Sequence, residues 1–260
     1  MRGDGSGFPR HAVAVLGGAG IVPLATGEAC AVVFDTRAWA EHGEAAFSCL
    51  GPDERARAAR FRFRADRDAY VMSHALWRAV LQVCLGSCTA PGDSLLLATH
   101  SSGQPWLPDP PAWATSLSRS GPFAAVAVAH AAWVGVDIER FPPRQSLEEV
   151  MATISTPAEC DAIGRHVGEA RARAMLQLWT DKEAVLKAWG TGLVLDPVRV
   201  DTLARPVQHP DREGRPCNLN VPALPPALVG ALAAPPGLAG VRQVVLGPLG
   251  DRLGANSCTN

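Results

Sequence analysis

The stretch WTDKEAVLKAWGTGL, residues 179–193, combines two tryptophans, two lysines and a glutamate, and its last four residues include two glycines. Successive helical residues turn by about 100°, so apolar residues three or four positions apart share one face. In this segment and the turn before it, that face contains Met175, Leu178, Leu186 and Trp189. Lys182 falls inside the apolar face, so its ammonium group must reach solvent along its stem or meet an anion. The stretch therefore predicts a helix that is half core and half functional site.

The composition around this helix is that of a soluble globular protein with a sizeable core. The chain has 260 residues, of which 47 % are hydrophobic. Its 24 basic and 25 acidic side chains leave a formal charge of −1, which indicates neither a nucleic acid nor a membrane as a partner. The first ten residues lack the apolar segment of a signal peptide, and the apolar run at 123–136 is too short to cross a bilayer. We expect a cytoplasmic monomer whose seven cysteines are reduced and mostly buried.

The distribution of segments predicts an α+β fold made of two similar halves. Residues 1–20 are expected to form a loose arm, 21–140 the N-terminal half and 141–260 the C-terminal half, with the FPPRQS linker at 141–146. Helical spacing marks 66–86, and a capping box at Thr156, Pro157 and Glu159 begins the helices that lead to Trp179. Strands are expected at 30–38, 94–99, 114–118, 123–130, 132–138, 197–203, 217–221, 227–233 and 241–246. Each half would pack helices on a small antiparallel sheet, and the halves would meet near the linker.

The segment WVGVDIER, residues 133–140, alternates in polarity as a strand does. Val134, Val136 and Ile138 point to one face, so Asp137 and Glu139 share the other. At about 7 Å their repulsion costs roughly 2 kcal/mol unless solvent or a cation relieves it. Oxygen ligands of this kind suit Mg²⁺, which is commonly completed by substrate phosphates. A solvated edge strand with its acidic residues outward remains the alternative for this segment taken alone.

The helix at 179–193 adds the other groups that metal and phosphate chemistry needs. Glu183 lies between Lys182 and Lys187, and acidic ligands can hold an ion while lysines neutralise phosphate oxygens. An ordinary amphipathic helix with a Glu–Lys pair at i, i+4 is the alternative. The two segments together favour a site for a metal ion and a phosphate group.

Read together, VGVDIE (134–139) and WTDKEAVLKAWGTGL resemble the paired signature of the Sfp-type 4′-phosphopantetheinyl transferases. The second segment matches W-x-x-K-E-A-x-x-K-x-x-G-x-G-L at every fixed position. Weaker features of the family follow the same order along the chain: the arginine-rich RFRFRADRDAYVMSHALWR, GQPWLPD, and SLSRSG where the family has S-H-S. The resemblance covers roughly residues 50–205.

The resemblance implies an enzyme that transfers 4′-phosphopantetheine from coenzyme A to a serine of an acyl or peptidyl carrier protein, releasing adenosine 3′,5′-bisphosphate. It also implies a pseudo-twofold pair of α+β halves with the active site at their interface. By the resemblance, Asp137, Glu139 and Glu183 hold Mg²⁺, Glu183 helps to deprotonate the serine, and Lys187 stabilises the leaving nucleotide. Residues that would bind coenzyme A are Arg57, Arg67, Gln104, Pro105, Ser118, Arg119, Lys182 and Lys187. Lys182 would pair either with acidic neighbours or with phosphate.

The chain departs from the family at two of these positions. Gln104 stands where Lys or Arg is frequent, and Arg119 stands where histidine is usual. The arginines at 57, 60, 62, 64 and 67 would form either a solvated basic face or a surface for phosphates or an acidic carrier protein. His74 and His130 are expected to be structural rather than catalytic.

Two other functions are compatible with parts of this pattern. A metal-dependent nuclease also combines carboxylates with a lysine, usually two residues after an acidic ligand, whereas Lys187 follows Glu183 by four. A catalytically inactive module that binds coenzyme A or a carrier protein is the other, and the three acidic positions, all occupied, speak against it. The natural carrier, its pathway and the use of acyl-coenzyme A stay open at this point.

Overall fold

A computed structural model describes residues 7–86, 97–100, 103–108, 112–247 and 252–258, the last segment by its backbone only. The helices are α1 (Gly7–Gly18), α2 (Gly43–Ser48), α3 (Pro52–Ala58), α4 (Arg64–Leu85), α5 (Glu148–Ile154), α6 (Pro157–Gly164) and α7 (Gly168–Trp189). Short 3-10 turns are η1 (Thr36–His42), η2 (Gly192–Val194) and η3 (Pro197–Arg199). In the described part of the chain, none of the helices combines the length and apolarity needed to cross a bilayer.

The strands form two main sheets and a short hairpin. The larger sheet has the order β10-β9-β1-β5-β4, in which β1 and β9 run parallel and the other neighbours antiparallel. The smaller sheet has the order β6-β8-β7 and is antiparallel. The strands are β1 (Glu28–Asp35), β2 (Ala98–Thr99), β3 (Pro105–Trp106), β4 (Ala114–Ser120), β5 (Phe123–Ala129), β6 (Gly135–Arg140), β7 (Asn218–Asn220), β8 (Leu228–Ala234), β9 (Gly240–Leu246) and β10 (Arg252–Cys258).

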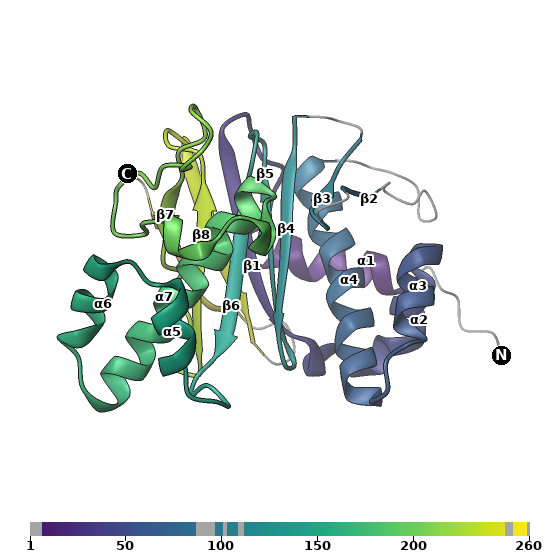
Figure 1. Ribbon diagram of the computed structural model, residues 1–260. Coiled ribbons are helices and arrows are strands. Elements are labelled where there is room, and N and C mark those ends of the chain that lie inside the picture. Colours follow the sequence, from purple (N-terminus) through teal and green to yellow (C-terminus); the bar gives the residue numbers. More distant parts are fainter. Residues whose placement is uncertain (1–6, 87–96, 101–102, 109–111, 248–251, 259–260) are drawn as a thin grey trace.

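The elements pack in layers through three hydrophobic cores, with helices outside and the sheets between them (Figure 1). One face of the larger sheet packs on α1 and α4 through residues such as Val32, Phe34 and Leu76. Its other face meets the smaller sheet through Val33 and Ile138, and the far side of the smaller sheet packs on α7. This arrangement confirms the α+β class, whereas the pseudo-twofold relation of the halves stays a prediction.

The N-terminal segment is the clearest correction to the expected organisation. Residues 1–20 were expected to form a loose arm, but Gly7–Gly18 is a helix with Phe8, Ala12 and Leu16 buried. These three side chains recur every four residues and therefore share one helical face. Glycine and arginine in the surrounding sequence hid this short apolar stripe. Residues 1–6 lie outside the described part of the chain.

Most other elements follow their local signals. Helices α4 and α7 both end at a glycine in the left-handed conformation, Gly86 and Gly190. The capping box of α6 is present, with Thr156 and Glu159 bonded reciprocally. The strand expected at 197–203 is wrong, because Asp196 caps a 3-10 turn that begins at Pro197. Strand β10 was not anticipated, and most of the strand expected at 94–99 lies outside the described residues.

The sheets do not divide at the linker after residue 140. Strands β9 and β10 come from the C-terminal part of the chain but complete the larger sheet beside β1. Strand β6 comes before the linker but belongs to the smaller sheet, where it packs against α7. A Cβ atom at Gly135 would lie 2.0 Å from the carbonyl oxygen of Ala184, so only glycine lets β6 and α7 approach this closely. This contact brings the acidic strand and the charged helix together.

Candidate active site

The acidic face of β6 lies against the charged face of α7. Asp137 and Glu139 alternate with apolar residues on β6, and Lys187 lies one helical turn after Glu183 on α7. The Lys187 Nζ atom donates a hydrogen bond to Asp137 Oδ1 at 2.6 Å and another to Ser118 Oγ at 3.2 Å. The structure therefore joins the two segments that the sequence singled out.

Three carboxylates in this cluster influence one another. Burial raises the pKa of Glu183, and the negative charges of Asp137 and Glu139 raise it further, against the opposing effect of Lys187. Burial likewise raises the pKa of Glu139, and Asp137 adds to the shift while a hydrogen bond from Ser120 opposes it. The cluster therefore holds closely spaced negative charge, a setting that favours a cation.

Three serines of β4 connect this cluster to the larger sheet. The hydroxyls of Ser116, Ser118 and Ser120 accept hydrogen bonds from the backbone N–H groups of Val136, Ile138 and Arg140, at 3.2, 3.3 and 3.0 Å. We call these residues the serine ladder. Ser118 also donates to Asp137 Oδ1 at 2.7 Å, and Ser120 donates to Glu139 Oε2 at 2.5 Å. The same side chains thus join the two sheets and orient both β6 carboxylates.

The donor set of the cluster suits a hard divalent cation. All three candidate ligands are carboxylates, and Asp137 Oδ2 is buried without a hydrogen-bond partner. As placed, however, no group of three His, Cys, Asp or Glu side chains in the described chain could hold a metal ion. Lys187 occupies the other oxygen of Asp137, so its ammonium balances one of the three carboxylates. The chemistry of the ligands fits Mg²⁺. For the ion to bind, the three carboxylates would have to move closer to one another.

A cavity of about 770 Å³ opens beside Lys187, between the N-terminal helices and the end of α7. We call it the interface cavity. Its walls come from α3, α4, the β2–β3 hairpin, β4 and α7, so both parts of the chain contribute. Of the residues expected to bind coenzyme A, those that line it are Arg57, Gln104, Pro105, Arg119 and Lys187. Its volume is in the range of pockets that hold small molecules.

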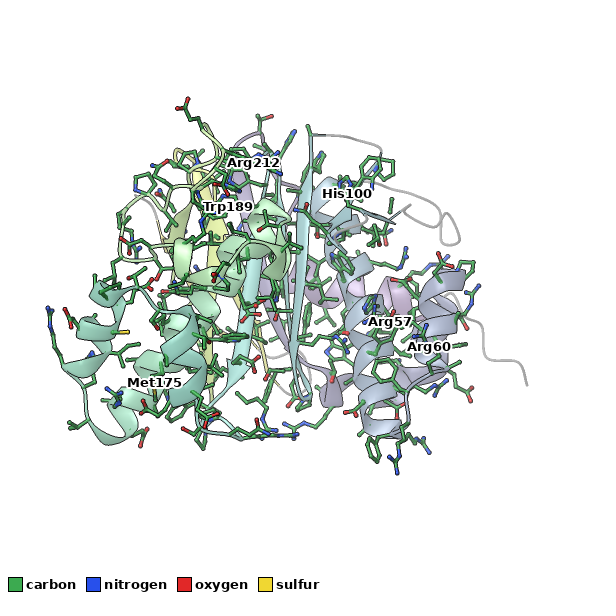
Figure 2. The ribbon with its side chains drawn as sticks, in the orientation of Figure 1. Arg57, Arg60, His100, Met175, Trp189 and Arg212 are labelled. Atoms are coloured by element: carbon green, nitrogen blue, oxygen red, sulfur yellow. The ribbon has the colours of Figure 1, made fainter. Side chains whose placement is uncertain are left out.

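Two arginines lie on one tyrosine in this cavity. The guanidinium carbon of Arg57 is 5.9 Å from the centre of the Tyr70 ring, and that of Arg119 is 5.1 Å from it. Burial lowers the pKa of Arg119, and the nearby Arg57 lowers it further, while Tyr70 and Asp66 oppose the shift. Figure 2 shows Arg57 among the helices of the N-terminal half. Two neighbouring positive charges without an ion-pair partner among the described residues form a site suited to phosphate.

Gln104 has a structural contact as well as a place in the cavity wall. Its Nε2 atom donates to the carbonyl oxygen of Lys187 at 3.2 Å, a carbonyl in the last turn of α7 that also accepts a hydrogen bond from the N–H group of Gly190. Gly190 follows with φ +69°, and a Cβ atom there would lie 1.9 Å from Gln104 Oε1. The glycine therefore ends the helix and makes room for the amide, which fixes the helix end next to Lys187.

Lys182 is placed differently from Lys187. It is 1 % exposed, and its ammonium lies 2.8 Å from Glu159, which is equally buried. The same group donates to the carbonyl oxygens of Pro197 and Val200 at 2.9 and 2.6 Å. Of the two expectations for Lys182, the structure therefore shows the acidic neighbour, and the expected phosphate contact is corrected. A buried ion pair with these extra acceptors satisfies the ammonium completely.

Arg67 also lies away from the expected place. It is in the first turn of α4, with its guanidinium carbon 5.2 Å from the Phe47 ring and a nitrogen 3.6 Å from Asp68. It lines a second cavity, on the far side of that turn, and not the interface cavity. Arg64 pairs with the same aspartate at 3.3 Å, so part of the arginine-rich stretch is neutralised locally.

The wall of the interface cavity also contains a charged network that the sequence did not reveal. Glu54 of α3 accepts hydrogen bonds from His74 Nδ1 at 2.8 Å and from Arg78 Nη2 at 2.7 Å. Burial raises the pKa of Glu54, but the bond from His74 and the charge of Arg78 outweigh it and lower the pKa to about 2. Burial lowers the pKa of His74 despite this carboxylate. His74 is thus held in the cavity wall. The contact could not be predicted from the local sequence, because 20 residues separate His74 from Glu54.

His130 lies outside both cavities. Its ring stacks on Trp113 with the ring centres 4.3 Å apart, in keeping with the structural role expected from the sequence.

Comparison with known proteins finds similarity in the same region of the chain. A family model described as the 4′-phosphopantetheinyl transferase superfamily matches residues 133–221, which include β6 and α7. The chain is 32 % identical to 4′-phosphopantetheinyl transferase HetI of Nostoc sp. over 147 residues, 55 % of this chain and 61 % of the relative. It is 32 % identical to a phosphopantetheinyl transferase of Thraustochytrium sp. over 157 residues, 55 % of this chain and 54 % of the relative.

A vertebrate protein is similar to a comparable extent. The L-aminoadipate-semialdehyde dehydrogenase-phosphopantetheinyl transferase of Xenopus laevis is 29 % identical over 170 residues, 61 % of this chain and 55 % of that protein. The chain thus spans a little over half the length of these relatives. The matched segment contains Asp137, Glu139, Glu183 and Lys187, the residues that meet between β6 and α7. In residues 133–221, which include β6 and α7, the chain is similar to the 4′-phosphopantetheinyl transferase superfamily.

Proposed function

We propose that the protein transfers the 4′-phosphopantetheine group of coenzyme A to a serine hydroxyl of an acyl or peptidyl carrier protein and releases adenosine 3′,5′-bisphosphate. The observation that carries the proposal is the position of Lys187. This side chain bonds to Asp137 in the carboxylate cluster and also lines the interface cavity. A pyrophosphate at this point would have its nucleotide in the cavity and its reacting phosphorus beside the carboxylates.

Each part of the site has a proposed role in this reaction. Arg57 and Arg119 bind phosphate oxygens of the nucleotide in the interface cavity. Lys187 leaves Asp137 and neutralises the charge that develops on the departing phosphate. Glu183 takes the proton of the attacking serine, a role for which its raised pKa is suitable.

Asp137, Glu139 and Glu183 would hold Mg²⁺, which supplies charge neutralisation at the pyrophosphate. The ion would take over the position that Lys187 occupies on Asp137. The ladder serines Ser118 and Ser120 keep two of the three carboxylates in orientation.

The decisive experiment combines the protein with coenzyme A, Mg²⁺ and an apo carrier protein, and measures the mass of the carrier. Transfer should add about 340 Da, the mass of the phosphopantetheine group in this reaction class. The Asp137→Ala variant should bind coenzyme A through the interface cavity but transfer at a rate at least about a hundredfold lower, because the ligands act together. Near-normal turnover by folded Asp137→Ala would contradict the assigned site. An unchanged carrier mass with the wild-type protein would favour a non-catalytic binding module, and cleavage of a nucleic acid would favour a nuclease.

A further inference from the structure

The interface cavity contains a histidine whose tautomer is fixed by its neighbour. His74 of α4 lines the cavity, and its Nδ1 atom lies 2.8 Å from Glu54 Oε1. Burial raises the pKa of Glu54, but the hydrogen bond from His74 and the charge of Arg78 lower it to about 2. Glu54 is therefore ionised at neutral pH, and an ionised carboxylate can only accept hydrogen bonds. The Nδ1 atom of His74 must carry the proton that lies between them.

The other ring nitrogen of His74 is left as a hydrogen-bond acceptor. Burial lowers the pKa of His74, and the positive charges of Arg119 and Arg78 act in the same direction, against the carboxylate of Glu54. The ring is therefore neutral at neutral pH, and with the proton on Nδ1 the Nε2 atom carries a lone pair. Nε2 has no hydrogen-bond partner among the described residues, and it is not one of the buried unpaired atoms. His74 thus presents one acceptor to the cavity.

This acceptor lies close to the two arginines suited to phosphate. The ring centres of His74 and Tyr70 are 4.1 Å apart. The guanidinium carbons of Arg57 and Arg119 lie 5.9 and 5.1 Å from the centre of the same Tyr70 ring. The charge of Arg119 also acts on His74. A phosphate held by the two arginines would therefore lie beside His74.

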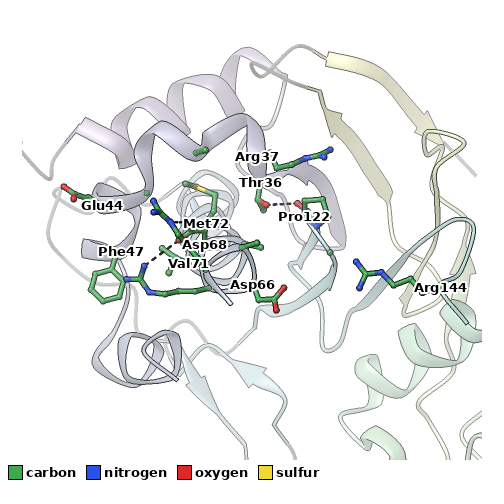
Figure 3. A pocket seen from close by; sticks show the side chains of 17 residues that line it. Thr36, Arg37, Glu44, Phe47, Asp66, Asp68, Val71, Met72, Pro122 and Arg144 are labelled. Atoms are coloured by element: carbon green, nitrogen blue, oxygen red, sulfur yellow. Dashed lines mark hydrogen bonds and ion pairs between the residues drawn. The ribbon is translucent and has the colours of Figure 1, made fainter. Parts of the chain in front are cut away.

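The second cavity, of about 520 Å³ at the first turns of α4, is less suited to a phosphate (Figure 3). Two of the arginines that line it, Arg64 and Arg67, lie 3.3 and 3.6 Å from Asp68. Their charge is already balanced locally, so an anion gains less attraction from them. Arg57 and Arg119 have no ion-pair partner among the described residues. The charges of the protein therefore favour the interface cavity for the phosphate of a nucleotide.

We propose that His74 determines the specificity for the sugar of the nucleotide, by accepting a hydrogen bond from the ribose 2′-hydroxyl group. The inference rests on the proposed function, in which the nucleotide lies in the interface cavity and its pyrophosphate lies at Lys187. The phosphate that remains for Arg57 and Arg119 is then the 3′-phosphate.

The chemistry of the nucleotide selects the hydroxyl as the partner of Nε2. Ionised phosphate oxygens have no proton to donate, so they cannot pair with a neutral acceptor. The 2′-hydroxyl is bonded to the carbon next to the one that carries the 3′-phosphate, and it is the donor nearest to that phosphate. The amino group of adenine is at the far end of the base. A site that binds a hydroxyl in this way discriminates against the analogue that lacks it, because the acceptor is then left unpaired.

The first test is calorimetric binding of adenosine 3′,5′-bisphosphate and 2′-deoxyadenosine 3′,5′-bisphosphate to the wild-type protein. We expect the dissociation constant of the deoxy analogue to be at least about fivefold higher, the effect of one lost hydrogen bond. Equal dissociation constants would overturn the proposal, while transfer from coenzyme A would leave the proposed function intact. Failure of either nucleotide to bind would overturn the proposal together with the nucleotide site of the proposed function.

The second test separates His74 from the sugar itself. His74→Phe keeps an aromatic ring against Tyr70 but removes Nε2, so the ratio of the two dissociation constants should fall to about one. His74→Gln places an amide oxygen near the position of Nε2 and should keep most of the ratio. The matched control is His130→Phe, because the His130 ring also stacks on an aromatic ring but lies outside both cavities.

The control should keep the wild-type ratio. His74→Leu provides a second variant without an acceptor if His74→Phe does not fold. A wild-type ratio in either folded variant would show that the preference for ribose arises elsewhere and would overturn the role of His74.

Discussion

At the scale of single residues, Arg119 offers the sharpest test of how the nucleotide is held. Its guanidinium lies over Tyr70 in the interface cavity, where burial and Arg57 lower its pKa and so disfavour the unpaired charge. A bound phosphate would relieve this cost, and arginine can present two parallel donors to it. Family resemblance places the coenzyme A 3′-phosphate at this position. We therefore predict that Arg119 binds this phosphate in place of the histidine that the resemblance implies, and that it offsets the neutral Gln104.

The prediction is that Arg119→Ala weakens the use of coenzyme A but not of 3′-dephospho-coenzyme A. Loss of a charge-assisted hydrogen bond costs about 1.5 to 3 kcal/mol, a decrease of roughly ten- to a hundredfold in kcat/KM. The measurement compares kcat/KM for both donors in the wild type and the variant. Equal losses with the two donors, or no loss with either, would assign Arg119 another role.

At the scale of elements, Lys182 joins α7 to α6 and η3. Its ammonium contacts Glu159 of α6 and the carbonyl oxygens of Pro197 and Val200 at the two ends of η3. Removing one partner of a buried ion pair leaves the other charge without compensation and typically costs about 3 to 5 kcal/mol. Lys182→Met should therefore lower the free energy of unfolding by about that amount, measured by urea denaturation. Its KM for coenzyme A should stay near the wild-type value, and a large rise in KM with little loss of stability would return Lys182 to the binding site.

Asp181, the preceding residue on α7, gives a pH-dependent prediction. Burial raises its pKa to about 6, against the hydrogen bond from Gln177 and the charge of Arg205. The folded protein therefore binds this proton more tightly than the unfolded chain, whose carboxyl has an ordinary pKa of 3.8. The stabilisation from protonated Asp181 is complete below pH 3.8 and is lost as pH rises through 6.

Asp181→Asn removes this loss, because an amide can accept the same hydrogen bond without ionising. The variant should be more stable than the wild type by on the order of 2 kcal/mol at pH 7, and the difference should shrink toward zero near pH 4. Urea denaturation at both pH values measures it, with Asp161→Asn on the exposed side of α6 as the control. A gain that is equal at the two pH values would show that ionisation of Asp181 is not its cause.

At the scale of the whole molecule, the predictable features are those with a local periodic signal. Helices α4 and α7, the cap of α6 and the two faces of β6 were evident from spacing alone, and the α+β class followed from them. Helix α1 was missed because its stripe of Phe8, Ala12 and Leu16 is short and lies among glycines. Strand β10 was missed because its place depends on pairing with β9, to which no local pattern points.

The residues of the candidate site also divide into those that the sequence predicted and those that it did not. Asp137, Glu139, Glu183 and Lys187 were predictable because each pair lies on one face of a single element. The contacts of Gln104 with Lys187 and of Glu54 with His74 were not, since 83 and 20 residues separate the partners. Lys182 was intermediate: its place in an apolar face predicted a need for an anion, and only the packing of α6 identifies that anion as Glu159.

The serine ladder connects the packing of the two sheets to the candidate site. It joins the sheets, and two of its members also bond to the β6 carboxylates. Each serine accepts a hydrogen bond from one β6 N–H group, so replacing any one by alanine removes the acceptor of a donor that is buried at Val136 and Ile138 and part-buried at Arg140. We expect each of Ser116→Ala, Ser118→Ala and Ser120→Ala to lower the free energy of unfolding by about 1 to 3 kcal/mol.

Ser120 is the member of the ladder that should change the pH dependence of transfer. Ser120 donates to Glu139 and lowers the pKa of that carboxyl, so its loss raises the pKa. If ionised Glu139 is needed, the acidic limb of the profile of kcat/KM against pH should move to higher pH in Ser120→Ala. Ser118 donates to Asp137, so Ser118→Ala should lower the rate of transfer as well as the stability. Ser116 donates to neither carboxylate in the structure, so Ser116→Ala should lose stability without a shift of the limb. An equal shift in all three variants would mean that the ladder acts through sheet packing alone.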